Sequence, residues 1–306
     1  MNKLTSELKK IGLSLGFDKI GITPAIQPPK SKNLEMWLKK GFAGMMDWMT
    51  IHQHKRMNID ELFPGARSVI CVAHNYFSPF YHSNKNTKGK ISRYACGEDY
   101  HRIMKKKLKT YLEKIKEIDP AINGRLCVDT APIMEKLWAE QAGLGWQGKN
   151  TNLITREYGS WVFLGEIIID KDLEGDTPIE DFCGSCQACL DACPTKALVS
   201  PYVMDARKCI SYLTIEFWDK PIPDDLKEKM NSWIFGCDIC QDVCPWNKFA
   251  KKTNEDRYRP KENIMEFDLT ELEKLDEGMY KNKFKKCPVL RPGWENFQRN
   301  VSAVKK

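Results

Sequence analysis

Eight of the twelve cysteines in this 306-residue chain lie between residues 183 and 244, in two short runs and the stretch that joins them. The first run, "CGSCQACLDACP" at residues 183–194, has the spacing C-x2-C-x2-C-x3-C-P. The second, "GCDICQDVCPWN" at residues 236–247, repeats only the later part of that pattern and has Ile234 where one more cysteine is expected. Thiolates at this spacing hold [4Fe-4S] clusters, so the chain is predicted to carry electrons.

The missing ligand can be predicted from how such runs share their clusters. In a two-cluster domain the fourth cysteine of each run binds the other cluster. Cys209, in "DARKCIS", is the only cysteine between the two runs and is predicted to complete the second site. The predicted sets are Cys183, Cys186, Cys189 and Cys244 for one cluster and Cys193, Cys209, Cys237 and Cys240 for the other. The alternatives are a zinc site, unliganded thiols or, for Cys209 alone, a small buried hydrophobic residue.

The composition indicates a globular protein, with 42% hydrophobic and 29% charged residues. No apolar run approaches the roughly 20 residues that span a bilayer. The N-terminal segment has the pattern of an amphipathic helix and lacks the features of a secretory signal. Closely spaced cysteines favour metal binding in a reducing compartment over disulfides. We therefore expect a cytoplasmic protein with no membrane partner.

The formal net charge of the chain is +7. Some of its basic residues are clustered in three runs, at residues 105–107, 251–252 and 281–286. Such runs often form the solvated face of a helix. Three of them on a basic chain also favour an anionic partner, such as a nucleic acid.

Helical and strand patterns alternate over residues 1 to about 170, which predicts an α+β or α/β arrangement. Strands are expected in "FDKIGIT" and "SVICVAHNYF", and the segment "NTNLITREYGSWVFLGEIIID" is expected to form a β-hairpin that turns at Tyr158-Gly159. Helices are expected near residues 34–40, 45–52, 100–118 and 133–142. Residues 251–306 are expected to form a short basic C-terminal tail.

Several segments together resemble the epoxyqueuosine reductase family. They are "RYACGEDYH", "VDTAPIMEKLWAEQAGLGWQGKNTNLI", "EYGSWVFLGEI", "CGSCQACLDACPTKAL", "RKCISYLT" and "GCDICQDVCPWN". The resemblance covers about residues 1–300 in a consistent order. It implies an enzyme that reduces epoxyqueuosine to queuosine on tRNA, the last step of queuosine biosynthesis, with cobalamin and two [4Fe-4S] clusters.

The resemblance also implies a fold and a domain plan. A nitroreductase-like cobalamin-binding α/β domain is expected over residues 1–172, followed by a bacterial-ferredoxin-like two-[4Fe-4S] domain over residues 173–250. Many family members continue into helical repeats that help to hold the tRNA, and the tail at residues 251–306 lacks them. The expected partners are the anticodon stem-loop carrying epoxyqueuosine and an unidentified low-potential electron donor, and the protein is expected to be a monomer.

The resemblance assigns candidate site residues as well. The cobalamin contacts that it implies are Arg56, Asp129, Leu153, Ser160, Leu164, Ser211 and Asp238. Asp129 is also expected to be the catalytic acid that protonates the departing oxygen, provided that burial raises its pKa towards neutrality. The alternative is that Asp129 or Thr130 caps a helix that begins near Pro132.

Two other functions compete with this interpretation. A cobalamin-dependent reductive dehalogenase would share both kinds of cofactor, but such enzymes usually carry export signals. A non-catalytic two-cluster electron carrier would need the clusters and no corrin.

Overall fold

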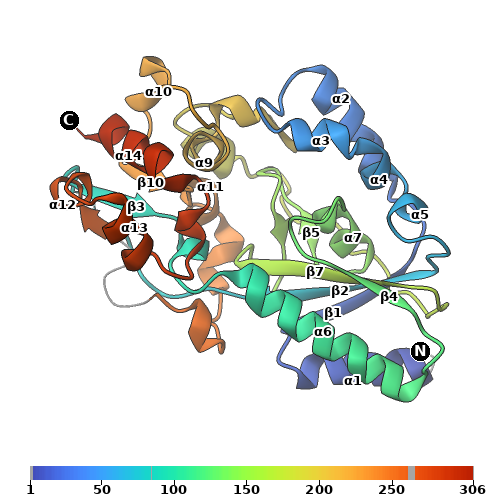
Figure 1. The fold of residues 1–306 in the computed structure, drawn as a ribbon. Helices are drawn as coiled ribbons and strands as arrows, with labels where there is room; N and C mark the ends of the chain where they lie inside the picture. Colours follow the sequence, from blue (N-terminus) through green and yellow to red (C-terminus); the bar gives the residue numbers. More distant parts are fainter. Residues whose placement is uncertain (1–2, 84, 261–265, 306) are drawn as a thin grey trace.

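The computed structural model describes residues 3–83, 85–260 and 266–305, which form a mixed arrangement of helices and sheets (Figure 1). Its centre is a four-stranded sheet in the order β1-β2-β7-β4, in which all neighbouring strands are antiparallel. The strands are β1 (Lys19–Pro24), β2 (Ser68–Asn75), β4 (Gly124–Cys127) and β7 (Val162–Ile169). The predicted α+β class is confirmed, and the nitroreductase-like description stays a prediction.

Helices cover both faces of this sheet. α1 (Lys3–Ser14) and α6 (Tyr100–Ile118) pack against one face, and α7 (Glu135–Gln141) packs against the other (Figure 1). α6 buries residues three or four positions apart, from Ile103 to Ile115, so one side of the helix faces the sheet. Asp99 caps α6 by accepting a hydrogen bond from the backbone N–H of His101. This cap fixes the first turn of α6 next to the end of β4.

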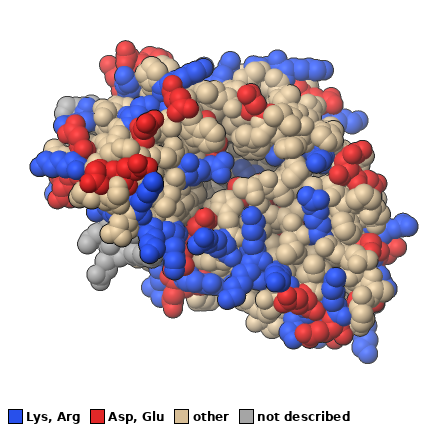
Figure 2. Space-filling view, in the orientation of Figure 1, with Lys and Arg blue, Asp and Glu red and all other residues tan. Residues whose placement is uncertain are grey.

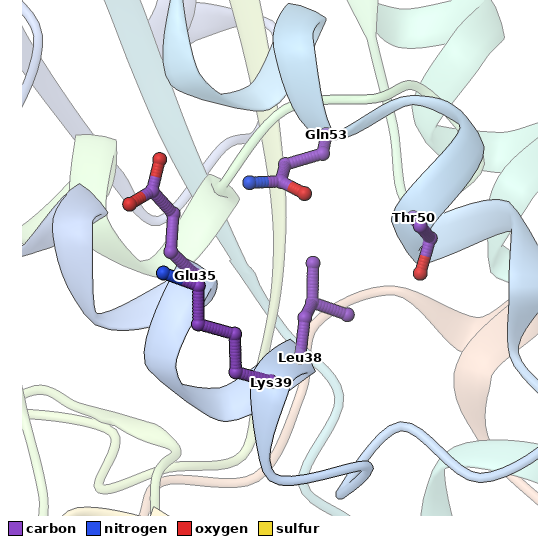
Figure 3. Close-up of a pocket in the computed structure, with 5 residues that line it drawn as sticks. All are labelled: Glu35, Leu38, Lys39, Thr50 and Gln53. Carbon is purple, nitrogen blue, oxygen red and sulfur yellow. The ribbon is translucent and has the colours of Figure 1, made fainter.

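Four short helices form an arm along the upper and right side of the molecule in Figure 1. They are α2 (Asn33–Lys39), α3 (Asp47–Ile51), α4 (Gln53–Met57) and α5 (Ile59–Leu62). Figure 3 shows a surface pocket of about 360 Å³ between them, lined by Glu35, Leu38, Lys39, Thr50 and Gln53. None of the described helices is both long enough and apolar enough to cross a membrane.

The prediction that the strands on either side of Tyr158-Gly159 pair with each other as a hairpin is wrong. β6 (Leu153–Ile154) pairs with β5 (Trp146–Gln147), and β7 pairs with β2 and β4 at the centre of the large sheet. Only an isolated bridge between Thr155 and Gly159 closes the turn. The pattern of residues could not distinguish these pairings, because both place apolar strands on either side of a glycine turn.

The cysteine-rich segment contains short elements joined by loops. They are α8 (Ala188–Ala192), β8 (Leu198–Ser200), β9 (Val203–Met204), α9 (Ile210–Ile215), α10 (Asp224–Lys227), β10 (Trp233–Phe235) and α11 (Ile239–Asp242). α8 and α11, which follow the first cysteines of the two runs, pack against each other. This contact brings the two cysteine runs together.

The expectation of a tail at residues 251–306 is corrected by the structure. The segment contains β11 (Glu266–Asp268), α12 (Leu269–Glu273), α13 (Glu277–Lys283) and α14 (Gly293–Val304). β11 and β10 flank β3 (Lys88–Ile91), so three distant parts of the chain share one sheet. Phe284, Phe297 and Val301 are fully buried in the same core as α9 and β10. The basic residues that suggested a tail lie on the outer surface of a packed unit.

Candidate active site

Asp129 lies in the turn that follows β4, and its backbone has a φ of 44°. This left-handed conformation is uncommon for a residue with a side chain. The side chain of Asp129 is 42% accessible. α7 begins only at Glu135, and no side chain caps it. The alternative that Asp129 or Thr130 caps a helix starting near Pro132 is therefore wrong.

His101 lies between two carboxylates. Its Nε2 is 2.9 Å from Oδ2 of Asp129, and its Nδ1 is 2.7 Å from Oδ1 of Asp99. Burial alone would lower the pKa of His101, but the hydrogen bonds to Asp129 and Asp99 and their charges outweigh burial and raise it to about 9. Burial would raise the pKa of Asp129, but the hydrogen bond and charge of His101 lower it overall. At neutral pH the proton is therefore on His101, and the expected rise in the pKa of Asp129 is wrong.

A second acid adjoins this pair. The backbone N–H of Asp129 donates a hydrogen bond to Oε1 of Glu135, the first residue of α7. Burial, and then the negative charge of Asp129, raise the pKa of Glu135 to about 8. A carboxyl group in this position holds its proton at neutral pH.

Two cations lie around the acids. Lys136 follows Glu135 on α7. Burial lowers the pKa of Lys136. The negative charges of Glu135, Cys240, Asp129 and Cys209 oppose this shift in part. Lys136 is therefore within electrostatic reach of both the acid site and two cysteines. Arg291, from the C-terminal segment, also lowers the pKa of Asp129 through its charge.

Four cysteines line a cavity of about 320 Å³ in the cysteine-rich segment. They are Cys183, Cys186, Cys189 and Cys244. Aromatic side chains, among them Phe182 and Trp246, complete the lining. Nζ of Lys149 donates hydrogen bonds to the backbone oxygens of Gly184 at 2.6 Å and of Cys186 at 2.9 Å. A cation held against this loop offsets part of the negative charge that four thiolates would carry.

The other four cysteines form a second group, made of Cys193, Cys209, Cys237 and Cys240. Burial, and then the charge of Cys209, raise the pKa of Cys237 and of Cys240, so Cys209 lies close to both. Backbone N–H groups at the start of α9 hydrogen-bond to the sulfur of Cys209. The charge of Cys189 acts on Cys240, so the two groups adjoin. No three His, Cys, Asp or Glu side chains among the described residues form a site for a single metal ion.

Asp238 lies inside a hydrogen-bond network, and its predicted contact with cobalamin stays a prediction. Its side chain is completely buried, and both oxygens are occupied. Oδ1 accepts a hydrogen bond from the hydroxyl of Ser92, and Oδ2 accepts one from the backbone N–H of Arg93 at 2.8 Å. The Arg93 guanidinium, 3.4 Å from Oδ2, lies over the ring of Trp161. The side chain of Asp238 therefore holds Arg93 in place.

The remaining predicted contacts are spread over several elements. Arg56 is 5% exposed, with its guanidinium over the ring of Trp48. The Ser160 hydroxyl accepts hydrogen bonds from the side-chain amides of Gln241 and Asn247, so it ties the start of β7 to the second cysteine run. The other three are Leu153 and Leu164, which belong to the core under α7, and Ser211, which is half-buried on α9.

His101, Glu135 and Lys136 were missed by sequence reasoning. His101 ends the segment "GEDYH", where an acid two residues before the histidine at a helix start was the available signal. Glu135 and Lys136 lie in an ordinary helical pattern, which gave no signal of a functional role. Their proximity to Asp129 depends on the turn between β4 and α7.

Two family models match the chain. One described as "4Fe-4S double cluster binding domain" matches residues 182–247, which include all eight cysteines of the two groups. The other, described as "Epoxyqueuosine reductase QueG, DUF1730", matches residues 56–130, which include His101 and Asp129.

Relatives match over the whole chain. The chain is 44% identical to the epoxyqueuosine reductase of Atelocyanobacterium thalassa (isolate ALOHA), with 99% of both chains covered. An epoxyqueuosine reductase structure with an epoxyqueuosine-modified tRNA-Tyr stem loop is 33% identical with a TM-score of 0.90, and the match covers 99% of this chain and 80% of that one. An epoxyqueuosine reductase structure from Bacillus subtilis, described with its catalytic aspartate loop swung out of the active site, is 32% identical with a TM-score of 0.89. That match covers 99% of this chain and 81% of the Bacillus subtilis chain. The chain therefore belongs to the epoxyqueuosine reductase family of oxidoreductases.

Proposed function

We propose that this protein reduces epoxyqueuosine to queuosine at the wobble position of tRNA, the last step of queuosine biosynthesis. The observation that carries the proposal is the His101–Asp129 pair, joined at 2.9 Å, whose neighbour Lys136 is also influenced by the charges of Cys209 and Cys240. A pair of groups that holds a proton thus lies near the end of an electron relay, as a proton-coupled reduction requires. The substrate is supported by the related enzyme that holds an epoxyqueuosine-modified stem loop.

The two cysteine groups fit two [4Fe-4S] clusters, because each offers four thiolates and backbone N–H groups that face sulfur. We call the two sites the outer and the inner cluster. The proposed ligands are Cys183, Cys186, Cys189 and Cys244 for the outer cluster and Cys193, Cys209, Cys237 and Cys240 for the inner one. Cys186 is exposed, whereas Cys209 and Cys240 lie near Lys136, so electrons would enter at the outer cluster and leave from the inner one.

Cobalamin is the second cofactor that we propose. Figure 2 shows a hollow near the middle of the molecule, between the upper helices and the central sheet. Asp129 and Ser211 have accessible surface, and Arg56, Ser160, Leu153 and Leu164 each expose a small edge of 3–9%. We propose these six residues, together with Asp238, as the cobalamin contacts. Bound cobalamin would supply a strongly reducing cobalt centre for opening the epoxide.

The chain's own residues would supply the proton. Removing the epoxide oxygen breaks two C–O bonds, and an unprotonated oxyanion is a poor leaving group. The proton held between His101 Nε2 and Asp129 Oδ2 is available to that oxygen, because Asp129 is the exposed member of the pair. Asp99 keeps the imidazole in position from the other side.

The tRNA would bind over the start of α6. Figure 2 shows Lys and Arg side chains gathered where this helix meets the C-terminal segment. Lys105 and Lys106 are exposed there, whereas Lys107 donates to the backbone just after α1 and pairs with Glu255. Within the part of the chain that the structure describes, the predicted run at 105–107 therefore offers two unpaired cations rather than three. We also propose a low-potential electron donor, of unidentified nature, at the outer cluster.

The test is conversion of epoxyqueuosine tRNA by anaerobically purified protein loaded with cobalamin and clusters. We expect conversion that depends on added cobalamin. A chlorinated phenol, offered as an alternative substrate, should be unchanged. Dehalogenation without conversion of the tRNA would favour a reductive dehalogenase, and cluster reduction with neither reaction would favour an electron carrier.

A further inference from the structure

Glu135 belongs to none of the groups assigned so far, yet it lies directly behind the proposed acid. We propose that Glu135 is the store of the second proton that the reduction consumes, and that it returns this proton to the Asp129–His101 pair. The inference rests on the proposed function and adds a residue to its mechanism.

The reduction requires a second proton. An epoxide plus two electrons and two protons gives an alkene plus water, with both C–O bonds broken and both protons on the departing oxygen. The electrons come from the reduced clusters and their low-potential donor. The His101–Asp129 pair shares one proton. The second must come from another group or from solvent before the oxygen can leave as water.

The geometry places Glu135 within one hydrogen bond of the backbone of Asp129. Its Oε1 accepts the N–H of Asp129, so its carboxyl lies against the turn that carries the acid. Its side chain is half-buried at the start of α7, between that turn and the sheet. A displacement of the Asp129 turn would therefore change the surroundings of Glu135 at the same time.

The charged and titratable groups around Glu135 come from every neighbouring element. Asp129 raises its pKa, and Lys136 and His101 lower it, each through its charge. Behind it, on β7, Glu166 is completely buried, and neither of its oxygens has a hydrogen-bond partner among the described residues. Burial, and then the charge of Glu135, raise the pKa of Glu166 well above the usual range. The pKa values of Cys71 and Cys127, the cross-strand neighbours of Glu166 on β2 and β4, are also raised in part by the charge of Glu135.

Burial next to one ionised carboxylate favours a protonated Glu135. Because Asp129 carries the negative charge that pairs with His101, a second charge on Glu135 would be unfavourable. Once His101 has given up its proton, Asp129 can accept the proton of Glu135 and restore the pair.

The competing explanation is structural, in which Glu135 only holds the Asp129 turn through its hydrogen bond. Glu135→Gln separates the two, because the amide oxygen still accepts the N–H while the side chain can no longer store a proton. We expect a folded protein with unchanged iron content and a turnover of epoxyqueuosine tRNA reduced by about 10²-fold. The wild-type rate should decline above pH of about 8, where Glu135 loses its proton. In Glu135→Gln this decline should be absent, and the rate should fall only near pH 9, where His101 loses its proton.

Glu140→Gln is the matched control. Glu140 is a buried acid on the same helix, where it pairs with Lys30 at 2.8 Å and accepts the N–H of Gln147. This variant should keep the wild-type rate and pH profile.

A second readout does not depend on turnover. Infrared difference spectra of the protein at pH 7 should show a protonated carboxyl band that disappears above pH of about 8 and is missing in Glu135→Gln. The proposal is overturned if no carboxyl band titrates in that range, or if the variant keeps the wild-type rate and profile. Failure of the wild-type protein to convert the tRNA would instead overturn the proposed function, whatever the infrared spectra show.

Discussion

At the scale of single residues, His101 sets the charge of the site because it lies between Asp99 and Asp129. Its raised pKa keeps it protonated at neutral pH, and this charge keeps Asp129 ionised. The proposed acid catalysis by Asp129 therefore does not need a neutral carboxyl in the resting protein. The proton resides on the imidazole and is shared along one hydrogen bond.

Asp129→Asn tests this arrangement. The variant should fold and keep both clusters, because Asp129 caps no helix and its backbone N–H remains. Turnover of epoxyqueuosine tRNA should fall by about 10²-fold or more, since an amide cannot pass on the proton. A rate near that of the wild type would remove Asp129 from the mechanism.

The same variant should change how stability depends on pH. The pKa of His101 is raised in the folded state, so its contribution to stability is complete below pH of about 6.5 and is lost as the pH rises through about 9. In Asp129→Asn, one of the two carboxylates responsible is gone. The melting temperatures of wild type and variant should therefore differ most below pH 6.5 and converge above pH 9.

Cys209→Ala tests the inner cluster. Only this cluster should lose a thiolate, so iron should fall from about eight per chain towards seven or four, according to whether a three-iron cluster survives. Cys96→Ala is the control, because Cys96 is a fully buried thiol outside both groups. Full iron and an unchanged cluster spectrum in Cys209→Ala would show that another group completes the site.

At the scale of elements, α14 supports the inner cluster from behind. It packs against α9 and β10, and the side-chain amide of Asn300 donates to the backbone oxygens of Thr214 and Ile234. α9 follows Cys209, and β10 leads into Cys237. The C-terminal segment thereby fixes the spacing of two proposed ligands.

Phe297→Ala should show this support. Phe297 is fully buried between Tyr280 and Phe284, so its truncation should lower the free energy of unfolding by about 3–5 kcal/mol. Iron should be lost preferentially from the inner cluster. Ser302→Ala, at an exposed position on the same helix, should change neither quantity. Equal loss of iron from both clusters would contradict a local role for α14.

The elements also show what the sequence can and cannot predict. The bounds of α6 agree with the prediction for residues 100–118, because a 3.6-residue apolar period and the Asp99 cap are local features. The pairing of β6 with β5 and the packing of residues 266–305 depend on contacts between distant segments, which local patterns do not contain. The cysteine groups could be predicted from spacing, whereas His101 and Asp129, 28 positions apart, meet only through the fold.

At the scale of the whole molecule, the positive charge lies close to the active site. The backbone N–H of Asp99 donates to the carbonyl of Lys286, so the last basic run lies beside the start of α6. Within that run, Lys281 pairs with Glu277, and Lys283 lies over the ring of Phe267. The cations that remain available are therefore fewer than the sequence count suggests.

The affinity for tRNA should accordingly fall with salt. Replacing Lys105 and Lys106 by Gln should reduce the slope of log affinity against log salt by about 0.7–0.9 for each phosphate that the two lysines neutralise. Lys109→Gln is the control, because this exposed lysine on the same helix pairs with Glu113. An unchanged slope in the double variant would limit the basic run at 105–107 to solvation.

The sheet made by β10, β3 and β11 has a consequence for biosynthesis. β3 comes from residues 88–91, and its two neighbours are synthesised some 140 and 175 positions later. While the chain is still growing on the ribosome, β3 lacks both partners, and Asn300 has not yet been added to tie α9 to β10. We therefore expect the proposed inner cysteines to reach their final spacing only after α14 has emerged, and iron and sulfide to enter this site after that point.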